Sequence, residues 1–405
     1  MLIEIPKYTE RFGAVRLHDI QRVLMLDTGD TPPETFGRAA MKITSEQISS
    51  ITNEMAIVIP IKNDEVKIFE GVLSGIPQNC LTIIVSNSST EKIDRFNIEI
   101  DALTHFHHFT RTPAIIVHQK NSYVGQTLKK AGYKKILDRS GHVRDGKAEG
   151  MIIGILLAKL FHKKFVGFVD ADNYIPGATL EYVRNYAAGF TMADSPYLMI
   201  RNSWGYKPKI RESEIFFQRR GRVTAEANKY LNAIISIITR FDTHVIRTGC
   251  AGEHAMNMAL AELMPIASSF AVETYELLFL LEEFGGVTPH KHKETIGKQV
   301  DLFQIETRNP HFHTERGGVH LKDMFRSSLS SIYHSALCNK EIKEEIRKEL
   351  IAMKIIKAGA EPPKPLVYPP INSIDFKLFT KEIKCAFEGE KEPDMIRLFG
   401  INKIQ

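Results

Sequence analysis

Two aspartates separated by one small residue are the feature of this 405-residue sequence best suited to metal chemistry. Asp170 and Asp172 flank Ala171 in the stretch GFVDADNYIP, directly after an apolar run. Carboxylate oxygens are preferred ligands of Mg²⁺ and Mn²⁺, and Mg²⁺ keeps positions open for substrate phosphates. The pair therefore predicts a divalent cation bridged to a diphosphate. A turn or helix start with two solvated aspartates is the alternative, but the position directly after an apolar strand favours the metal site.

Two short motifs place glycine and basic residues at the start of helical segments, where free backbone N–H groups favour anions. Lys147, in GKAEG, adds a point charge before the segment 149–161. GRVT, with Gly221, Arg222 and Thr224, precedes the segment 225–238. The guanidinium fork suits phosphate or carboxylate. For GKAEG, the alternative interpretation is an ordinary loop–helix junction. For GRVT, the alternative is that Thr224 is a plain N-cap.

Two further motifs offer groups for a sugar and for a metal ion. In TGCAGEH, Glu253 is expected to accept hydrogen bonds from sugar hydroxyls, and a structural left-handed turn is the competing interpretation. In NPHFH, His311 and His313 are two residues apart in an extended segment, so they point to the same side. A lone histidine is more often structural, but this pair predicts an imidazole that completes the metal shell.

Four short, apolar runs must position these residues. They lie at 55–61, 81–85, 114–117 and 165–169, are rich in β-branched residues, and end in polar residues at 62–64, 86–88, 118–120 and 170–172. Such runs, with helical segments between them, predict an open α/β sheet of buried parallel strands. Ligands of these sheets bind beyond the carboxyl ends of the strands. The polar tails are therefore predicted to line one crevice.

Changes in the pattern of apolar and polar residues along the sequence predict three regions. Residues 1–54 are interpreted as an N-terminal extension packed on the core, and residues 55–270 as the core itself. Residues 271–405 are predicted to be mainly helical, with segments at 323–335 and 341–356 and a proline-rich connection at 361–370.

Composition narrows the function classes. The hydrophobic share of 43% and the charged share of 25% are ordinary for a globular protein. The net charge of +5 comes without a basic stripe, so no nucleic-acid partner is expected. The four cysteines are far apart, which argues against a thiolate zinc site and a disulfide scaffold. The apolar stretch 151–161 is shorter than the ~20 residues that span a bilayer, so no membrane partner and a cytoplasmic location are expected.

Seven motifs together resemble the mannosyl-3-phosphoglycerate synthases. They are VIPIKND at 58–64, IVSNSS at 84–89, HQK at 118–120, GKAEGM at 146–151, GFVDADNYIPGA at 167–178, TGCAGEHAM at 248–256 and ETRNPHFH at 306–313. The resemblance runs over nearly the whole chain and implies a GT-A type glycosyltransferase. It also implies GDP-mannose as donor, D-3-phosphoglycerate as acceptor, a divalent cation and retention of the α configuration. The product would be a precursor of the compatible solute mannosylglycerate.

The resemblance also distributes roles over the motifs. Mg²⁺ is the expected cation, with Mn²⁺, Co²⁺ or Zn²⁺ as alternatives, and a homodimer is one candidate assembly. Asp172 and one of His311 and His313 are the expected metal ligands, and Asp170, Asp172 and Lys147 the catalytic groups. GRVT resembles the acceptor-phosphate site of related glucosyl-3-phosphoglycerate synthases, which assigns Gly221, Arg222 and Thr224 to the acceptor. The predicted donor-binding residues are Pro60, Lys62, Asn63, Ser86, Asn87, Gln119, Lys147, Asp170, Ala171 and Glu253.

Retention leaves two mechanisms open. Double displacement requires a carboxylate nucleophile under the sugar ring, for which Glu253 is the one candidate in these motifs. Front-face attack, in which the departing phosphate oxygen takes the proton, is the favoured hypothesis. Rival functions are a glucosyl-3-phosphoglycerate synthase, a sugar-phosphate nucleotidyltransferase and a non-catalytic nucleotide-sugar sensor. The loop 60–64 lacks the glycines expected of a nucleotidyltransferase.

Overall fold

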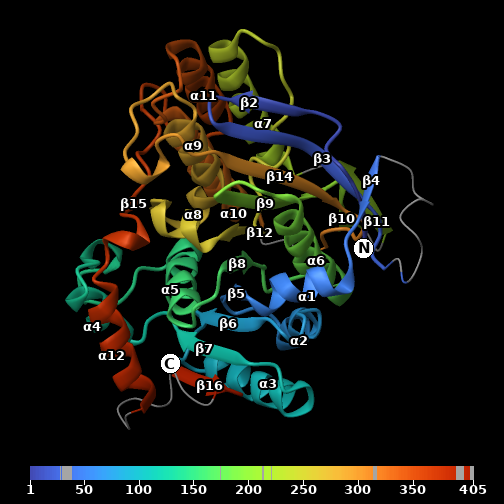
Figure 1. Ribbon diagram of the computed structural model, residues 1–405. Coiled ribbons are helices and arrows are strands. Elements are labelled where there is room, and N and C mark those ends of the chain that lie inside the picture. Colours follow the sequence, from blue (N-terminus) through green and yellow to red (C-terminus); the bar gives the residue numbers. More distant parts are fainter. Residues whose placement is uncertain are drawn as a thin grey trace. The chain divides into compact units, whose positions relative to one another are not determined.

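The computed structural model describes residues 1–27, 29, 39–173, 175–211, 214–219, 221–312, 317–388 and 396–401 (Figure 1). The chain forms two compact units, each built from three segments. Unit A comprises Glu46–Ala187, Glu253–Ile266 and Tyr368–Gln405. Unit B comprises Met1–Ser45, Ala188–Gly252 and Ala267–Val367.

The sheet of unit A has four parallel strands at its centre. Their order is β7-β6-β5-β8, with antiparallel β16 beside β7 and antiparallel β12 beside β8. The bounds are β5 Met55–Ile61, β6 Leu81–Ser86, β7 Ala114–His118, β8 Phe165–Phe168, β12 His254–Asn257 and β16 Ile396–Phe399. Because neighbouring parallel strands end at the same edge, the carboxyl ends of β5 to β8 meet there. This edge is where the sequence predicts a ligand.

One proline lies inside this central sheet without breaking it. Pro60 is in β5 and pairs in register with Val85 of β6. On its other side, β8 pairs only with the part of β5 from Met55 to Val58. Pro60 therefore lies beyond the end of β8. No residue of β8 needs a hydrogen bond from a backbone N–H at this position, so proline is tolerated there.

Helices flank the sheet of unit A, and α5 packs on β5 and β6 (Figure 1). The approach of α5 is close because Gly154 faces Val58, and a Cβ at Gly154 would lie 2.3 Å from Val58 Cγ1. Helices α4 and α12 lie side by side. The helices are α1 Ser45–Asn53, α2 Val66–Ser74, α3 Arg95–Thr110, α4 Ser122–Lys130, η2 Lys134–Ile136, α5 Lys147–Leu160, α6 Pro176–Met192, α8 Met258–Leu263, η5 Ile371–Ser373 and α12 Phe376–Glu388.

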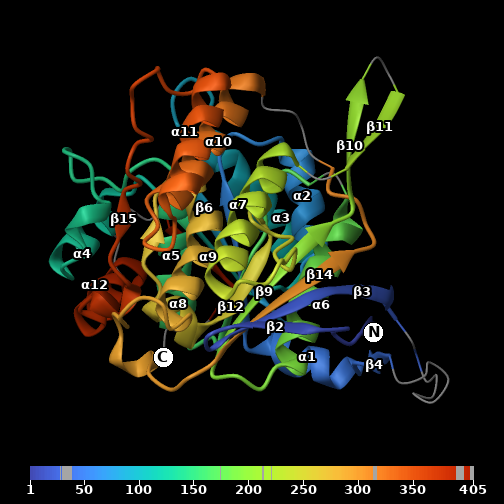
Figure 2. The ribbon, with the colours of Figure 1, turned by 90° about the horizontal axis from the view of Figure 1, so that it is seen from above.

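The strands of unit B that belong to the mixed sheet follow in the order β9-β14-β3-β1-β4, with β2 beside β3. Strand β14 runs parallel to both β9 and β3, and the pairs of β3 with β1 and β2 and of β1 with β4 are antiparallel. The strands are β1 Leu2–Glu4, β2 Thr9–Phe12, β3 Val15–Met25, β4 Ala40–Lys42, β9 Tyr197–Trp204 and β14 Val300–Thr307. An antiparallel hairpin of β10 Tyr206–Arg211 and β11 Glu214–Arg219 continues beyond β9 (Figure 2).

Helices of unit B pack on one another, with α10 in contact with α7, α9 and α11. The helices are α7 Arg222–Thr239, η3 Ser269–Ala271, α9 Val272–Phe284, η4 Lys293–Thr295, α10 Gly317–Tyr333 and α11 Lys340–Ala352. Two-residue strands β13 Ile266–Ala267 and β15 Val367–Tyr368 complete the described elements.

A fully buried arginine ties β9 to the rest of unit B. Arg201 donates from Nε to the Thr248 carbonyl at 3.0 Å, from Nη1 to Glu276 Oε2 at 2.8 Å, and from Nη2 to the Glu273 carbonyl at 2.7 Å. Its side chain is 0% exposed and that of Glu276 is 2% exposed. A buried charge is tolerated only when it is paired and hydrogen-bonded, and Arg201 meets both conditions.

The mostly parallel α/β sheet is confirmed, and the four predicted strands are β5 to β8 with ends shifted by at most one residue. The division into units groups the chain differently from the predicted regions 1–54, 55–270 and 271–405. The reason is long-range pairing: β3, near the N-terminus, lies beside β14, which is in the region predicted to be mainly helical. Periodicity along the chain does not reveal such pairing.

Candidate functional site

The loops after β5, β6 and β7 are hydrogen-bonded to one another at the carboxyl edge of the sheet of unit A. The backbone N–H of Asn87 donates to the Ile61 carbonyl at 2.8 Å, and the backbone N–H of Gln119 donates to the Ser86 carbonyl at 2.6 Å. Asn63, with a left-handed φ of 60°, accepts at Oδ1 from the Ser89 amide at 2.9 Å. The loops therefore bring Lys62, Asn63, Ser86, Asn87 and Gln119 together at this edge.

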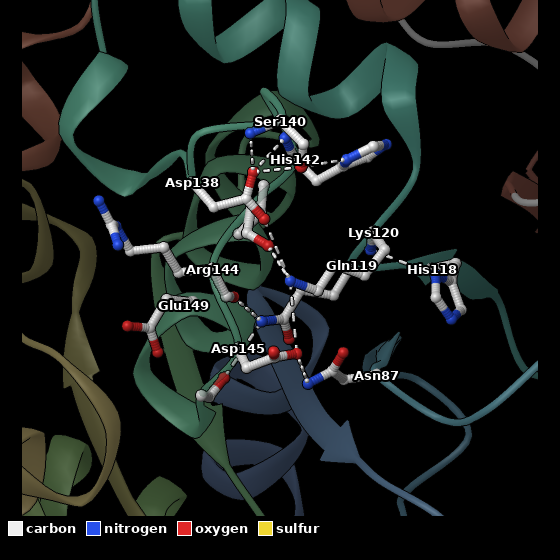
Figure 3. A network of polar contacts seen from close by, with 12 residues as sticks. Asn87, His118, Gln119, Lys120, Asp138, Ser140, His142, Arg144, Asp145 and Glu149 are labelled. Atoms are coloured by element: carbon white, nitrogen blue, oxygen red, sulfur yellow. Dashed lines mark hydrogen bonds and ion pairs between the residues drawn. The ribbon is translucent and has the colours of Figure 1, made fainter.

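The loop before α5 is fastened to this edge by two side chains from the end of β7 (Figure 3). Gln119 Nε2 donates to the Arg144 carbonyl at 2.6 Å and to the Gly146 carbonyl at 3.3 Å. Lys120 Nζ donates to the Val143 carbonyl at 2.7 Å. Since Gln119 is buried and committed to these carbonyls, its observed role is to hold the loop.

Lys120 also lies between two carboxylates of this loop, Asp138 at 3.7 Å and Asp145 at 3.4 Å (Figure 3). Asp145 Oδ1 accepts from Asn87 Nδ2 at 3.1 Å. Partial burial opposes ionisation of Asp145, but the Asn87 hydrogen bond and the charges of Lys120 and Lys62 outweigh it and lower its pKa. The pKa of Asp138 is lowered chiefly by the Ser140 hydroxyl. Lys120 belongs to the HQK motif and to the polar residues after the third predicted strand, whereas Asp138 and Asp145 belong to none of the sequence motifs.

His118, at the end of β7, is a structural member of this edge. Its Nε2–H donates to the Ser88 carbonyl at 2.9 Å, and its Nδ1 accepts from the Lys120 amide at 3.2 Å. These two contacts fix the neutral tautomer. Burial lowers the pKa of His118 below its usual 6.5. The imidazole is therefore a hydrogen-bonding link between two strand ends.

Lys147 and Asp170 form an ion pair at the start of α5 and the end of β8. The distance from Lys147 Nζ to Asp170 Oδ1 is 2.6 Å, and the side chains are 12% and 29% exposed. The structure thus brings together two residues that the sequence assigns to one site. Partial exposure leaves this pair open to a ligand, and a cation beside a carboxylate suits a site that handles both a metal and a phosphate.

The buried carboxylate of Glu149 packs against Gly146, in the turn that precedes Lys147. Gly146 has φ of 150°, and a Cβ there would lie 2.0 Å from Glu149 Oε2, so only glycine fits. Glu149 is 0% exposed and accepts at Oε1 from the Tyr368 hydroxyl at 2.6 Å. Tyr368 is 219 residues away in sequence, and no local sequence pattern predicts this contact.

The second aspartate lies in a turn fixed by its neighbours. Asp172 is half-buried, between buried Ala171 and fully buried Asn173. Asn173 Nδ2 donates to the Tyr182 hydroxyl at 2.8 Å, and its Oδ1 accepts from the Ile175 amide at 2.9 Å. Asn173 therefore holds the turn that carries the Asp pair, a role not recognised in the sequence.

Glu253 begins the short segment of unit A that contains β12, and its side chain is 1% exposed. The next residue, His254, places its ring 4.8 Å from that of Phe168 in β8. Strand pairing therefore places His254, the last residue of the motif, opposite Phe168 at the end of β8, shortly before the Asp pair.

A small cleft in unit B is lined by the predicted acceptor residues Gly221 and Thr224. Helix α7 starts at Gly221, which has no capping side chain, so the amides of its first turn receive no hydrogen bond from the N-cap. The lining is Asn202, Ser203, Trp204, Gly221, Thr224, Arg247, Thr248 and Cys250. Arg222 is exposed and directly follows Gly221, which lines the cleft.

Cys250 is a structural part of this cleft. Its carbonyl accepts from Thr224 Oγ1 at 3.1 Å, and its Sγ lies 3.3 Å from Thr274 Oγ1 and 3.4 Å from Ser328 Oγ. Burial raises the pKa of the Cys250 thiol to about 11, so the thiol is protonated at neutral pH. The loop is thereby fixed to α7 on one side and to α9 and α10 on the other.

His311 is 5% exposed and packs against Trp204 in a tilted arrangement, with ring centroids 4.6 Å apart and an interplanar angle of 36°. His311, one of the two histidines predicted as metal ligands, thus lies against a residue that lines the cleft of unit B. His313 lies outside the described residues. Across the described ranges, no group of three or more His, Cys, Asp or Glu side chains is already arranged around a metal position.

The sequence-predicted residues thus gather in two places. Unit A holds Pro60, Lys62, Asn63, Ser86, Asn87, Gln119, Lys147, Asp170, Ala171, Asp172 and Glu253. Unit B holds Gly221, Arg222, Thr224 and His311. Of the described helices, none is both long and apolar enough to cross a bilayer.

Sequence comparisons find the same relatives along nearly the whole chain. A family profile described as mannosyl-3-phosphoglycerate synthase matches residues 5–383. A mannosyl-3-phosphoglycerate synthase of Pyrococcus furiosus is 44% identical over 387 residues, which is 95% of this chain and 97% of that protein. One of Aeropyrum pernix is 35% identical over 384 residues, which is 95% of this chain and 97% of that protein.

Among solved structures, the fold resembles glucosyl-3-phosphoglycerate synthase of Mycobacterium tuberculosis. A complex with Mn²⁺, UDP-glucose and glycerol 3-phosphate gives a TM-score of 0.51 at 15% identity and covers 82% of this chain and 95% of the other. A complex with Mn²⁺, UDP-glucose and phosphoglyceric acid gives 0.50 at 17% identity and covers 86% and 99%. At this identity the likeness concerns the fold alone.

Proposed function

This chain belongs to the mannosyl-3-phosphoglycerate synthase family, and we propose that it transfers mannose from GDP-mannose to the 2-hydroxyl of D-3-phosphoglycerate with retention. The product would be 2-O-(α-D-mannosyl)-3-phosphoglycerate. The observation that carries the proposal is the Asp170–Ala171–Asp172 turn at the carboxyl end of β8, with Lys147 paired to Asp170. Its place at the edge of a parallel sheet is where nucleotides bind in such folds. We assign the enzyme to the cytoplasm.

The donor is proposed to lie along the loops after β5, β6 and β7, against Lys62, Asn63 and Asn87. These loops are hydrogen-bonded to one another, so their side chains are held ready before the nucleotide arrives. Preorganised polar groups lose less conformational freedom when a ligand binds. Gln119 and Lys120 would act indirectly, by holding the loop that leads to Lys147.

A divalent cation fits the donor set of the predicted metal site. Asp172 and one of His311 and His313 would hold it, because carboxylate oxygen and imidazole nitrogen both suit Mg²⁺ or Mn²⁺, and relatives of the same fold bind Mn²⁺. When bound, such a cation neutralises the charge that grows on the departing diphosphate. We propose Mg²⁺ as the physiological ion.

Lys147 supplies a second positive charge for the leaving group. Its ammonium is mostly buried and already lies 2.6 Å from Asp170, so it is oriented without cost at the moment of reaction. Two unit charges ~4 Å apart interact by about 4 kcal/mol at an effective dielectric near 20. A preorganised cation near the diphosphate would therefore lower the barrier substantially.

Acceptor binding is proposed at the start of α7. The uncapped amides after Gly221, the Arg222 guanidinium and the Thr224 hydroxyl would bind the phosphate of 3-phosphoglycerate. The Thr224 hydroxyl donates its single proton to the Cys250 carbonyl, so it would exchange this hydrogen bond for one to the phosphate when the acceptor binds. The acceptor would then be held at its phosphate end, with its 2-hydroxyl free to react.

We favour front-face attack, in which the acceptor hydroxyl gives its proton to the departing phosphate oxygen. Glu253 is the candidate nucleophile of the alternative, and its side chain is 1% exposed. Intact-protein mass spectrometry during turnover checks this choice. A mannosyl adduct on Glu253 would establish double displacement instead.

The test of the function is a mass measurement of the product formed by purified enzyme from GDP-mannose and 3-phosphoglycerate. Parallel reactions with GDP-glucose and UDP-glucose compare the donors. We expect a single product with the mass of a mannosylated phosphoglycerate, made fastest from GDP-mannose. Faster transfer from either glucose donor would replace the proposal with a glucosyl-3-phosphoglycerate synthase, and absence of any glycoside would refute both.

A further inference from the structure

The cleft of unit B contains one charged side chain among its lining residues, Arg247. The other lining groups are neutral: amides, hydroxyls, one thiol, one indole and glycine. A half-buried guanidinium in a neutral cleft has lost part of its hydration without a carboxylate to compensate. Such a group favours the entry of an anion.

The main chain on both sides of Arg247 is fixed. Its amide donates to Gln304 Oε1 at 2.7 Å, and its carbonyl accepts from Asn228 Nδ2 at 3.0 Å. Thr248 Oγ1 donates to the same Gln304 oxygen at 2.9 Å. The base of the Arg247 side chain is therefore rigid, while no described residue pairs with its guanidinium.

Arg201 provides the contrast within the same unit. Its guanidinium is fully committed to Thr248, Glu276 and Glu273 and serves the fold. Arg247 precedes Thr248 directly, yet its guanidinium has no such acceptors among the described residues. The two arginines thus divide into one that stabilises the protein and one that is available to a ligand.

The proposed acceptor carries two anionic groups, a phosphate on C3 and a carboxylate on C1. Gly221 and Thr224, which we assign to the phosphate, line the same cleft as Arg247. The carboxylate remains without a partner in that assignment. Its two oxygens match the guanidinium fork, which binds planar carboxylates through two parallel hydrogen bonds.

We propose that Arg247 binds the carboxylate of the acceptor and makes the enzyme specific for 2-hydroxy acids that also carry a phosphate. The inference rests on the proposed function, because it presupposes 3-phosphoglycerate as the acceptor. With the phosphate held at α7 and the carboxylate at Arg247, both neighbours of the reacting carbon are fixed. The 2-hydroxyl between them is then directed by two-point binding.

The test compares two ligands that differ in the carboxylate. 3-Phosphoglycerate has it, whereas glycerol 3-phosphate has a hydroxymethyl group in its place. Affinities of wild type and Arg247→Gln are measured by calorimetry for 3-phosphoglycerate and by competitive inhibition for glycerol 3-phosphate. We expect Arg247→Gln to weaken 3-phosphoglycerate binding about 10- to 100-fold, the range for a lost hydrogen bond to a charged group, and glycerol 3-phosphate binding less than about 3-fold.

Two further variants supply the comparison. Arg222→Gln removes a proposed phosphate contact and should weaken both ligands to a similar extent. Arg240→Gln makes the same charge change at the exposed far end of α7 and should alter neither. Arg247→Lys keeps the charge but not the fork and should recover only part of the affinity for 3-phosphoglycerate.

Equal weakening of both ligands by Arg247→Gln would overturn the assignment to the carboxylate, and unchanged affinity for 3-phosphoglycerate would overturn it as well. Circular dichroism of each variant distinguishes lost binding from lost folding. If wild type binds 3-phosphoglycerate through Arg247 but forms no mannosylated product, the proposed function fails and the binding site stands. If product forms but Arg247→Gln changes the affinity for both ligands equally, the proposed function stands and only the assignment of Arg247 to the carboxylate fails.

Discussion

Replacement of Arg201 by methionine is expected to lower the free energy of unfolding by about 3–5 kcal/mol, the usual cost of breaking a buried ion pair from one side. The structure gives three reasons for this size. Arg201 is completely buried, it donates to three buried acceptors at 2.7–3.0 Å, and one acceptor is the Glu276 carboxylate. Methionine fills part of the volume but leaves the Glu276 charge without the guanidinium.

The assay is urea denaturation followed by far-ultraviolet circular dichroism. Arg326→Met is the matched control, because Arg326 pairs with Asp323 on the surface of α10, with side chains 49% and 44% exposed. Its loss should cost less than about 1 kcal/mol. The double variant Arg201→Met/Glu276→Met removes both charges and should recover most of the stability, since apolar replacements of buried pairs are often neutral.

The explanation is refuted if Arg201→Met unfolds at the same urea concentration as Arg326→Met. A different failure is also informative. If the double variant is no more stable than Arg201→Met, the loss comes from the Thr248 and Glu273 carbonyls and not from the carboxylate.

Asp172→Asn should lower kcat on the order of 100-fold or more without changing the circular dichroism spectrum, and normal turnover would contradict its assignment to the metal. Chelation of divalent ions should stop wild-type turnover and added Mg²⁺ or Mn²⁺ should restore it, so full activity in the presence of chelator would exclude a metal role. Tyr368→Phe deprives buried Glu149 of a 2.6 Å hydrogen bond and should cost about 1–3 kcal/mol in urea denaturation, whereas Tyr8→Phe at an exposed site should cost nothing measurable. Because burial lowers the pKa of His118, the unfolded chain binds a proton that the folded chain does not, so stability falls as the pH drops below about 6.5. His118→Asn should remove this contribution to the pH dependence. The check is to compare the urea midpoints of wild type and His118→Asn above and below pH ~6.5, and an equal pH dependence of the two proteins would contradict the assignment.

The core of the fold could be predicted because its strands are local patterns. The run MAIVIPI became β5 without any change of its ends, since a strand buried on both faces needs apolar, β-branched residues throughout. The Asp pair could be located for the same reason, because it directly follows such a run. The helical segment predicted from residue 225 begins three residues earlier, at Arg222, because the sequence pattern locates a helix better than it locates its ends.

What could not be predicted depends on residues far apart in sequence. Tyr368 reaches Glu149, and β3 pairs with β14, across hundreds of residues for which no periodicity exists. Arg247 was overlooked because its neighbours Thr248 to His254 form the more conspicuous motif. Only the cleft, which gathers residues from β9, α7 and the loop after it, distinguishes Arg247 from the other arginines.

The packing of Trp204 against His311 has a practical consequence, because Trp204 is the only tryptophan in the chain. All indole emission of the protein therefore originates in the wall of one cleft, and no engineered label is needed to watch that wall. A ligand that enters this cleft beside the indole is expected to shift the spectrum or to quench its intensity. Stopped-flow mixing can then time ligand arrival separately from sugar transfer.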